Sequence, residues 1–316
     1  MKLFNMTICM SDMFFIFMSF LLEWVGVLVS VAFFVLLERK LLGYVQDRLG
    51  PNKVGFVGIF QSVSDAIKLF SKEEFFLYQF DYYMYYLSPM IGFFMSLLLI
   101  LSLPYNLNFL SMELFLLYLM SCLSMGGYWF LMASWASNSI YSMLGGIRSI
   151  VQALSYEVCM FIMFLIMFLY SESYSIKMFM EFKCMFILVN MGMFMLIYIS
   201  LLAELNRMPF DFVEGESELV SGFNTEYMSG MFALFFLAEY LMMIIISMLL
   251  VILFLGLEMM SLKFTIMVMV IMMSLIMIRG VLPRMRYDLL MDLCWYLMLP
   301  LVLIMLYFMM ILKFYI

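Results

Sequence analysis

Residues 230–255 read GMFALFFLAEYLMMIIISMLLVILFL, an apolar run in which Glu239 is the single charged residue. A helix of about 20 mostly apolar residues crosses the roughly 30 Å hydrocarbon core of a bilayer, so this run is long enough to span a membrane. The rest of the chain has the same character, because 67% of its 316 residues are hydrophobic and the mean hydropathy is +1.12. The composition therefore predicts a polytopic membrane protein.

Seven other apolar runs along the chain have a similar length. Together they predict an all-α protein with about eight transmembrane helices, folded as one integral membrane domain over residues 1–316. The predicted spans are residues 14–37, 82–103, 112–133, 147–169, 184–203, 230–255, 262–282 and 293–313.

Eight spans would place both termini on one side of the membrane. The loops on the other side would be residues 38–81, 134–146, 204–229 and 283–292. Eleven of the 16 basic residues lie in or beside these four loops. The positive-inside rule then predicts that the loops face the cytoplasm or an organelle matrix.

The first of these loops contains an amphipathic segment, FVGIFQSVSDAIKLFSKEE, at residues 56–74. Its apolar residues repeat at helical spacing, whereas polar residues occupy the opposite face. We expect an interfacial helix at the headgroup boundary. A simple membrane anchor is the alternative, but the charged stretch before it, bent by Gly43, Gly50 and Pro51, favours a shaped opening near the membrane surface.

The absence of histidine from the sequence limits the chemistry of the chain. Without imidazole it cannot supply the histidine ligands of a b-type haem or of a typical zinc site. Its five cysteines show no CxxC spacing, so we expect them to pack in the helices. Proton chemistry would have to use carboxylates, Tyr, Lys, Arg or water.

Four acidic residues stand out within or at the ends of the predicted spans, namely Glu23, Glu157, Glu204 and Glu239. Ionisable groups in hydrocarbon are costly and often mark an ion or proton pathway. A carboxylate paired with a neighbouring helix, without further function, is the alternative for each. Burial raises the pKa of a carboxyl group, so such groups can exchange protons when a nearby charge changes.

The stretch DFVEGESE, residues 211–218, holds Asp211, Glu214, Glu216 and Glu218. If it were helical, three of these acids would share one face and repel one another. Arg207 is the only base between residues 184 and 262, so relief must come from protonation, water or partner cations. A solvated acidic loop is the alternative, but the interleaved Phe, Val and Leu residues favour burial against partners.

Four motifs resemble those of a known family. They are ERKLLGYVQDRLGPNKVGFVGIFQSVSDAIKLFSKE at 38–73, GGIRSIVQALSYE at 145–157, AELNRMPFDFVEGESELVSGFNTEY at 203–227 and LPRMRYDLLMDLCW at 282–295. In this order they are similar to the chain 1 family of NADH-ubiquinone oxidoreductase, the membrane heel of mitochondrial respiratory complex I.

The resemblance implies a role as one subunit of the proton-pumping NADH:ubiquinone reductase, located in the mitochondrial inner membrane with both termini toward the intermembrane space. Ubiquinone would be the substrate, and the chain would hold no flavin, haem, iron-sulfur cluster or metal. The expected partners are the quinone-site subunits of the hydrophilic arm, small membrane subunits and lipid, and no nucleic acid. The chain would form the membrane wall of the ubiquinone tunnel and relay protonation changes to the pumping arm.

The resemblance also implies roles for individual residues. The quinone tunnel would be lined by Arg39, Asp65 and Arg279, with Arg207 and Arg284 as further candidates. The path of acids toward the pumping arm would comprise Glu157, Glu204, Asp211, Glu214 and Glu239, and the same loop holds Glu216, Glu218 and Glu226. Glu23 matches no motif of the family and is left outside the path.

Two other classes of protein remain open from the residues alone. A stand-alone channel or secondary transporter would carry buried acids, but it usually shows internal repeats with broken helices, and the sequence shows no such self-similarity. The membrane anchor of an energy-converting hydrogenase shares part of the loop pattern. Migration on native gels would separate a small transporter from a subunit of a very large assembly.

Overall fold

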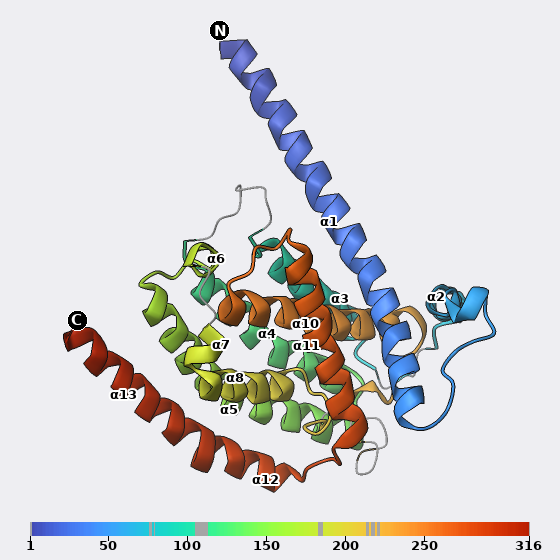
Figure 1. Cartoon of the computed structure of the whole chain (residues 1–316). Coiled ribbons are helices and arrows are strands. Elements are labelled where there is room, and N and C mark those ends of the chain that lie inside the picture. The colour runs from blue at the N-terminus through green and yellow to red at the C-terminus, as the bar shows by residue number, and fades with distance from the viewer. Residues whose placement is uncertain are drawn as a thin grey trace. The chain divides into compact units, whose positions relative to one another are not determined.

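The computed structural model is helical along the chain and holds no strand among the residues it describes (Figure 1). These are residues 2–75, 78, 80–104, 113–182, 186–212, 215, 219 and 222–315, with the backbone alone for residues 2–17, 182 and 189. The chain divides into two units, residues 1–65 and 66–316.

The described helices follow one another along both units. They are α1 (Lys2–Val45), the 3₁₀ turn η1 (Phe56–Gly58), α2 (Gln61–Ser71), α3 (Tyr82–Leu101), α4 (Phe115–Ala136), α5 (Ile140–Ser171), α6 (Lys177–Phe182), α7 (Phe186–Val189), α8 (Met191–Glu204), the 3₁₀ turn η3 (Gly222–Asn224), α10 (Ser229–Leu255), α11 (Leu262–Val281), α12 (Tyr287–Asp292), the π-helical turn η4 (Leu293–Met298) and α13 (Leu299–Tyr315).

Seven of the described helical segments are long and apolar enough to cross a membrane. They are Met18–Val45, Tyr82–Leu101, Phe115–Ala136, Ile140–Ser171, Ser229–Leu255, Leu262–Val281 and Tyr287–Tyr315. Each overlaps a predicted span, and the shorter helix α8 overlaps the remaining one, at 184–203. The predicted all-α, polytopic class is confirmed.

The span predicted at residues 184–203 is not one continuous helix. Asn190 separates α7 from α8, and its φ of −131° lies outside the helical range. Its side-chain amide donates a hydrogen bond of 2.6 Å to the Tyr170 hydroxyl. Asn disfavours helix interiors because its amide competes with the backbone for hydrogen bonds. The 14 residues of α8 are thus fewer than the roughly 20 that a full crossing needs.

The fourth span begins earlier than predicted, so most of the predicted loop at 134–146 is helical. α5 starts at Ile140, after the N-cap Ser139, whose hydroxyl accepts a hydrogen bond from the Ser142 N–H. N-cap side chains of this kind satisfy a free amide of the first helical turn. Gly145 and Gly146, which suggest a loop in the sequence, instead lie in the first turns of α5 and are buried.

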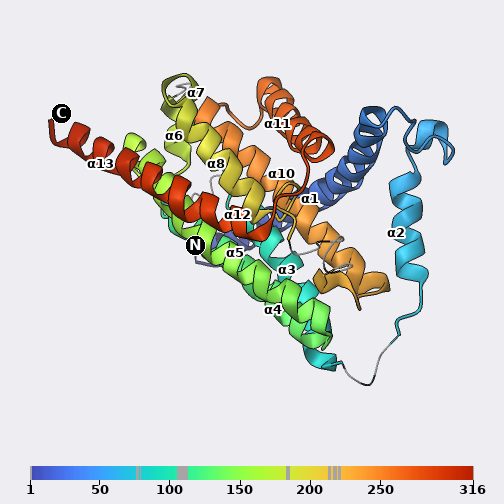
Figure 2. The same ribbon diagram turned by 90° about the horizontal axis from the view of Figure 1, so that it is seen from below.

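Small residues let the helices of the second unit approach closely, as is common in membranes. A Cβ added at Gly146 of α5 would lie 1.9 Å from the Oγ and 2.5 Å from the Cβ of Ser134 on α4. One added at Gly92 of α3 would lie 2.9 Å from the Trp129 ring of α4. In Figure 2, α3, α4 and α5 lie beside one another, with α10 against α3.

An aromatic cluster fixes the segment before α10 to this bundle. The Phe223 side chain is fully buried and meets the Phe130 and Phe235 rings edge to face. Tyr227 stacks on Tyr85 with 4.4 Å between ring centroids, and its hydroxyl donates to the Ala133 carbonyl at 3.2 Å. Burial raises the pKa of Tyr227, so it remains a protonated donor.

The C-terminal helices lie along α5 in Figure 2. The Tyr156 hydroxyl donates to the Leu290 carbonyl at 3.2 Å, and the Cys294 thiol donates to the Ser155 carbonyl at 3.3 Å. The sulfurs of Cys159 and Cys294 are 3.6 Å apart. Cys159, Cys294 and Cys122 are buried, which confirms the predicted packing role for these three; the Cys9 side chain and Cys184 lie outside the described residues.

In the first unit, the chain turns tightly between α1 and α2. Gly58 has a φ of +80°, and a Cβ there would lie 2.2 Å from the Pro51 carbonyl oxygen. The Lys40 ammonium donates to the Val57 carbonyl at 2.8 Å. Gly58 is therefore required where the two ends of the turn meet.

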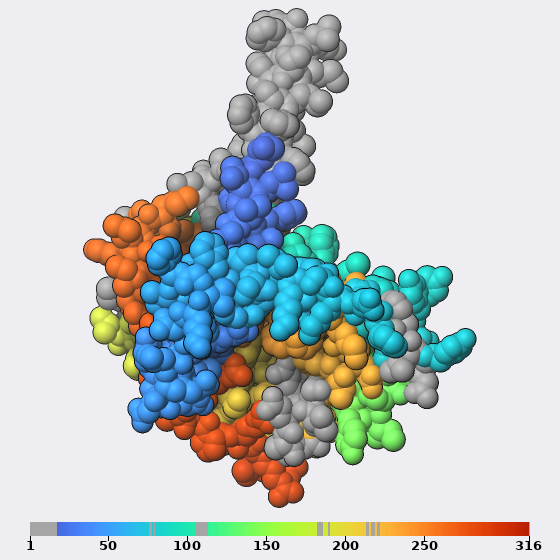
Figure 3. Space-filling view, turned by 90° about the vertical axis from the view of Figure 1, so that its right-hand side faces the viewer, coloured from blue at the N-terminus to red at the C-terminus, as the bar shows by residue number. Residues whose placement is uncertain are grey.

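The predicted amphipathic helix is confirmed over the range of α2. Phe56 belongs to the separate turn η1, because the backbone between Phe56 and α2 is not helical at Val57. None of the residues of α2 is buried. In the space-filling view the segment 56–71 forms part of the surface (Figure 3). The apolar residues Val63, Ile67 and Phe70 of α2, and Phe56, Ile59 and Phe60 before it, are exposed.

We predict that Gly146→Ala lowers the stability of the helix bundle by about 1–3 kcal/mol, as overpacking of a filled core does. The added methyl would overlap the Cβ of Ser134, which cannot rotate away. Gly192→Ala is the matched control, because nothing lies within 4 Å of a Cβ at that helical position. Thermal unfolding of the assembled protein measures both variants, and an equal effect on the midpoint would contradict the close contact of α4 and α5.

Candidate functional site

The acid Glu204, at the end of α8, lines a partly open cavity of about 40 Å³ in the second unit. Its lining comes from α3, α4, α5, α8 and α10 and includes Ser96, Gly126, Ser149, Glu204, Asn206 and Glu239. A cavity of this size has room for roughly two or three water molecules. The structure thus brings together two of the predicted acids, Glu204 and Glu239, around a space that water can enter.

Glu204 has an oxygen that the described protein groups leave without a partner. Its Oε2 atom is buried and accepts no hydrogen bond from the described residues. Its Oε1 atom would be 3.7 Å from a Cβ at Gly126, so this glycine leaves space beside the carboxyl group. Glu157, half-buried on α5, interacts electrostatically with Glu204. Because a buried carboxyl oxygen without a donor costs free energy, the adjoining cavity is the natural place for its partner.

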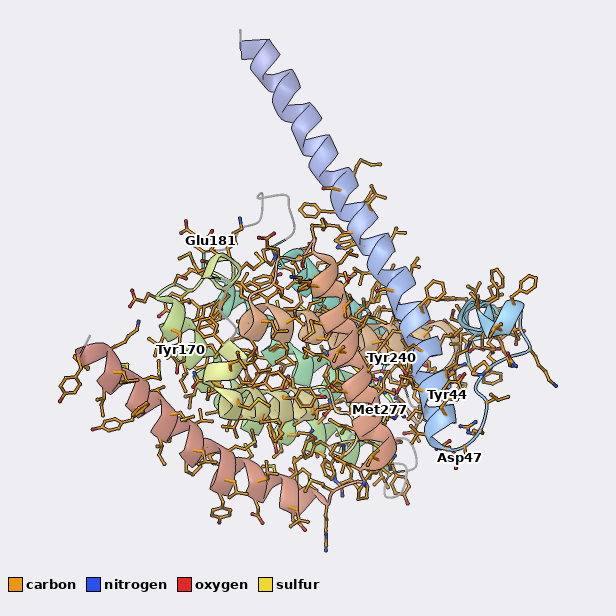
Figure 4. The ribbon with its side chains drawn as sticks, viewed as in Figure 1. Tyr44, Asp47, Tyr170, Glu181, Tyr240 and Met277 are labelled. Carbon is orange, nitrogen blue, oxygen red and sulfur yellow. The ribbon has the colours of Figure 1, made fainter. Side chains whose placement is uncertain are left out.

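Glu239, in the middle of α10, is paired with a cation. The Arg207 guanidinium lies 3.6 Å from its carboxylate, and each side chain is only 12% exposed. Arg207 also lies over the Tyr240 ring, 4.7 Å from the centroid, and Tyr240 is labelled on α10 in Figure 4. The arginine thus offsets the charge of the acid and stacks on its neighbour.

Asp211, the first acid of the DFVEGESE stretch, is buried and paired with Arg284 at 3.4 Å. Close by, the Met285 N–H donates to the Pro209 carbonyl at 3.1 Å. The loop after α8 is therefore joined to the segment between α11 and α12. Repulsion among the acids of this stretch is relieved, for Asp211, by a cation from a distant part of the chain.

Gln152 of α5 is a residue that the sequence reasoning did not single out. Its side-chain amide donates to the Ala203 carbonyl at 2.7 Å and to the Phe210 carbonyl at 3.2 Å. The available signal was a large polar side chain inside an apolar span, since such groups need internal partners. Gln152 lies in one of the four family motifs but is not an ionisable group.

Other predicted residues lie elsewhere or outside the described range. Arg39 and Asp65 form an ion pair within the first unit, and Gln61 donates to the same carboxylate at 2.9 Å. Arg279 is partly exposed in the last turn of α11. Glu226 is half-buried, and its backbone carbonyl accepts a hydrogen bond from Tyr85. Glu214, Glu216 and Glu218 lie outside the described residues.

Carboxylates and arginines dominate the site chemically. In the described part of the chain no three His, Cys, Asp or Glu side chains gather in a way that would hold a metal ion. The acids at the cavity instead have two different environments. Glu239 and Asp211 face guanidinium groups, whereas Glu204 faces the cavity and Glu157. Such an arrangement can bind, hold and pass protons.

Comparisons with known proteins show which proteins are similar to this chain in sequence. Residues 18–310 match a family model described as NADH dehydrogenase. The chain is 45% identical over 301 residues to NADH-ubiquinone oxidoreductase chain 1 of Locusta migratoria, covering 95% of this chain and 96% of the relative. The proteins of the same name from Aedes aegypti (46% identity, 92% and 96% covered) and Papio hamadryas (41%, 90% and 93%) are also similar over nearly their whole lengths.

We predict that Arg207→Met destabilises the protein by about 3–5 kcal/mol, because it leaves Glu239 buried without its cation. Arg286→Met is the matched control: its pair with Asp288 is 78% and 70% exposed, so the loss should stay below about 1 kcal/mol. The midpoint of thermal unfolding reports both. Adding Glu239→Gln to Arg207→Met should recover part of the loss, and strictly additive effects would argue against the pair.

Proposed function

Because the chain belongs to the NADH dehydrogenase family, as a chain 1 subunit of NADH-ubiquinone oxidoreductase, we propose that it lines the path of ubiquinone and relays protonation changes through its buried carboxylates. It is a multi-pass protein of the mitochondrial inner membrane and one subunit of respiratory complex I. Ubiquinone is the substrate of the assembly, and the other subunits are its partners. The full-length relatives favour this assignment over a stand-alone transporter or a hydrogenase anchor.

One observation carries the relay proposal: Glu204 and Glu239 line the same cavity, and Glu157 acts electrostatically on Glu204. Arg207 and Asp211 follow Glu204 within one short loop. This loop therefore holds one ion pair to the middle of α10 and another to the segment that carries Arg284. A change of charge at one end of this series alters the field at the other, because the surroundings screen it poorly.

The driving event is the reduction of ubiquinone, which takes two electrons and two protons. An anionic intermediate, or the withdrawal of protons near the membrane, would change the field felt by the carboxylates. We propose that Glu157, Glu204, Asp211 and Glu239 answer as one coupled group, whose pKa values belong to the group. In the same loop, Glu214, Glu216, Glu218 and Glu226 would extend the array or contact the hydrophilic arm.

The quinone path is proposed to involve Arg39, Asp65 and Arg279, with Arg207 and Arg284 nearer the acids. The Arg39–Asp65 pair lies at the junction of α1 with the amphipathic helix, whose exposed apolar face suits the membrane surface. Arg279 ends a transmembrane helix with a guanidinium group. In this proposal the loops at 38–81, 134–146, 204–229 and 283–292 face the matrix and the termini face the intermembrane space.

We predict that Glu204→Gln lowers ubiquinone-linked turnover roughly 100-fold, the low end of what a positioned proton-transfer group contributes, and lowers the protons pumped per electron pair. The rate of NADH oxidation with an artificial acceptor that takes electrons from the hydrophilic arm should not change. Glu172→Gln, at an exposed carboxylate paired with Lys313, is the control. A fully assembled Glu204→Gln complex that pumps with normal stoichiometry would refute the role given to this acid.

For the tunnel, we predict that Arg279→Ala raises the apparent KM for ubiquinone about tenfold, equivalent to ~1.4 kcal/mol of binding, and weakens quinone-site inhibitors. Lys263→Ala, at the exposed other end of α11, should change neither. Steady-state kinetics with a short-chain quinone measures both variants. If Arg279→Ala keeps the normal KM and inhibitor sensitivity, Arg279 is a structural residue.

A further inference from the structure

Gln152 contacts the two ends of the loop that carries the predicted acids and Arg207. It lies on α5 with 1% of its surface exposed. The two hydrogens of its Nε2 atom go to two different carbonyl groups, those of Ala203 and Phe210. These peptide groups immediately precede Glu204 and Asp211. A single side chain therefore holds the backbone next to each acid.

We propose that Gln152 is a positioning residue of the proton relay, which fixes the backbone next to Glu204 and Asp211 so that each acid keeps its place. This inference rests on the proposed function of these acids. It assigns to Gln152 no contact with ubiquinone and no proton transfer. The amide acts only through the two carbonyl groups that it holds.

The loop needs such a support because regular helical hydrogen bonding ends within it. The last carbonyls of a helix lack the regular partner one turn further on. Ala203 belongs to the last turn of α8, and its carbonyl accepts a hydrogen bond from the Asn206 N–H of the turn at 3.2 Å in addition to that from Gln152. Beyond Glu204 the chain turns through Asn206, whose φ of +51° lies in the left-handed region. The Phe210 N–H donates to the Arg207 carbonyl at 2.8 Å. The amide of Gln152 on α5 binds the carbonyl groups at the two ends of this turn, those of Ala203 and Phe210.

The chemistry of the amide is suited to two carbonyl acceptors. Its NH₂ group carries two donors, one for each carbonyl. The Oε1 atom is buried and accepts no hydrogen bond from the described residues, a destabilising feature that an apolar side chain of similar size would avoid. Simple packing at this position would favour such an apolar side chain. The two donated hydrogen bonds therefore indicate that this amide does more than fill space.

The first test uses Gln152→Met, which keeps the length of the side chain and removes both donors. In the assembled complex, amide hydrogen exchange in the segment 203–212 should become faster by at least about tenfold, as local opening becomes easier. Ubiquinone-linked turnover should fall in the same variant. Ser247→Ala is the control, because among the described residues the buried Ser247 hydroxyl donates a hydrogen bond within its own helix, to the Ile244 carbonyl. Unchanged exchange in the Gln152→Met complex would overturn the proposal.

The second test uses Gln152→Glu, which makes the support depend on pH. In its protonated form the new acid donates one hydrogen bond to a carbonyl group, whereas in its ionised form it faces both carbonyl oxygens and repels them. Turnover relative to the original protein should therefore fall as the pH rises through the pKa of the introduced acid. A structural role alone predicts a loss that is the same at every pH, and that result would count against positioning.

The outcomes separate this inference from the relay itself. Exchange in the segment 203–212 reports the support by Gln152 whether or not Glu204 carries protons. If Glu204→Gln leaves pumping normal while Gln152→Met still loosens the segment, the relay is wrong and the support by Gln152 stands. If Glu204→Gln stops pumping while Gln152→Met leaves exchange unchanged and Gln152→Glu causes a loss that is the same at every pH, the relay stands and the role of Gln152 is wrong.

Discussion

The hydrocarbon core of a membrane offers no hydrogen bonds, and this constraint governs the whole structure. Backbone groups must be satisfied within each segment, so the described spans are helical. Side chains face the same constraint, because a buried ion without a partner is costly. The ion pairs Arg207–Glu239 and Arg284–Asp211 follow from it. Because lipid is as apolar as the helices, the hydrophobic effect does not drive the helices together. Close packing at Gly146 and Gly92 holds them against one another instead.

Apolar length and periodicity made most of the fold predictable. Seven of the eight predicted spans overlap described helices long enough to cross a membrane, because the bilayer sets the length of the apolar run. Two details depended on contacts between segments and were missed. Asn190 interrupts the span at 184–203, where its side chain binds Tyr170. Gly146, predicted in a loop, lies in α5 in close contact with Ser134 of α4. Neither contact leaves a periodic signal in the sequence.

The sequence could single out candidate acids but not the partners that they contact. The cost of charge in an apolar span was enough to identify Glu157, Glu204 and Glu239 from the sequence. The repulsion within DFVEGESE was predicted to be relieved by protonation, water or cations of a partner. For Asp211 this prediction is wrong, because its cation is Arg284, far along the same chain. Gln152 was missed because an uncharged amide carries no distinctive signal in the sequence, and its two carbonyl partners are brought to it only by the fold.

The environments of the acids give them unequal parts in the proposed relay. For Glu239 or Asp211 to gain a proton, an ion pair with arginine must weaken, which resists the change and couples it to movement of the loop. Glu204 faces a cavity with room for water and has an oxygen without a donor among the described residues. Its proton occupancy can change without loss of an ion pair. We infer that Glu204 responds first and that the paired acids transmit the response through Arg207 and Arg284.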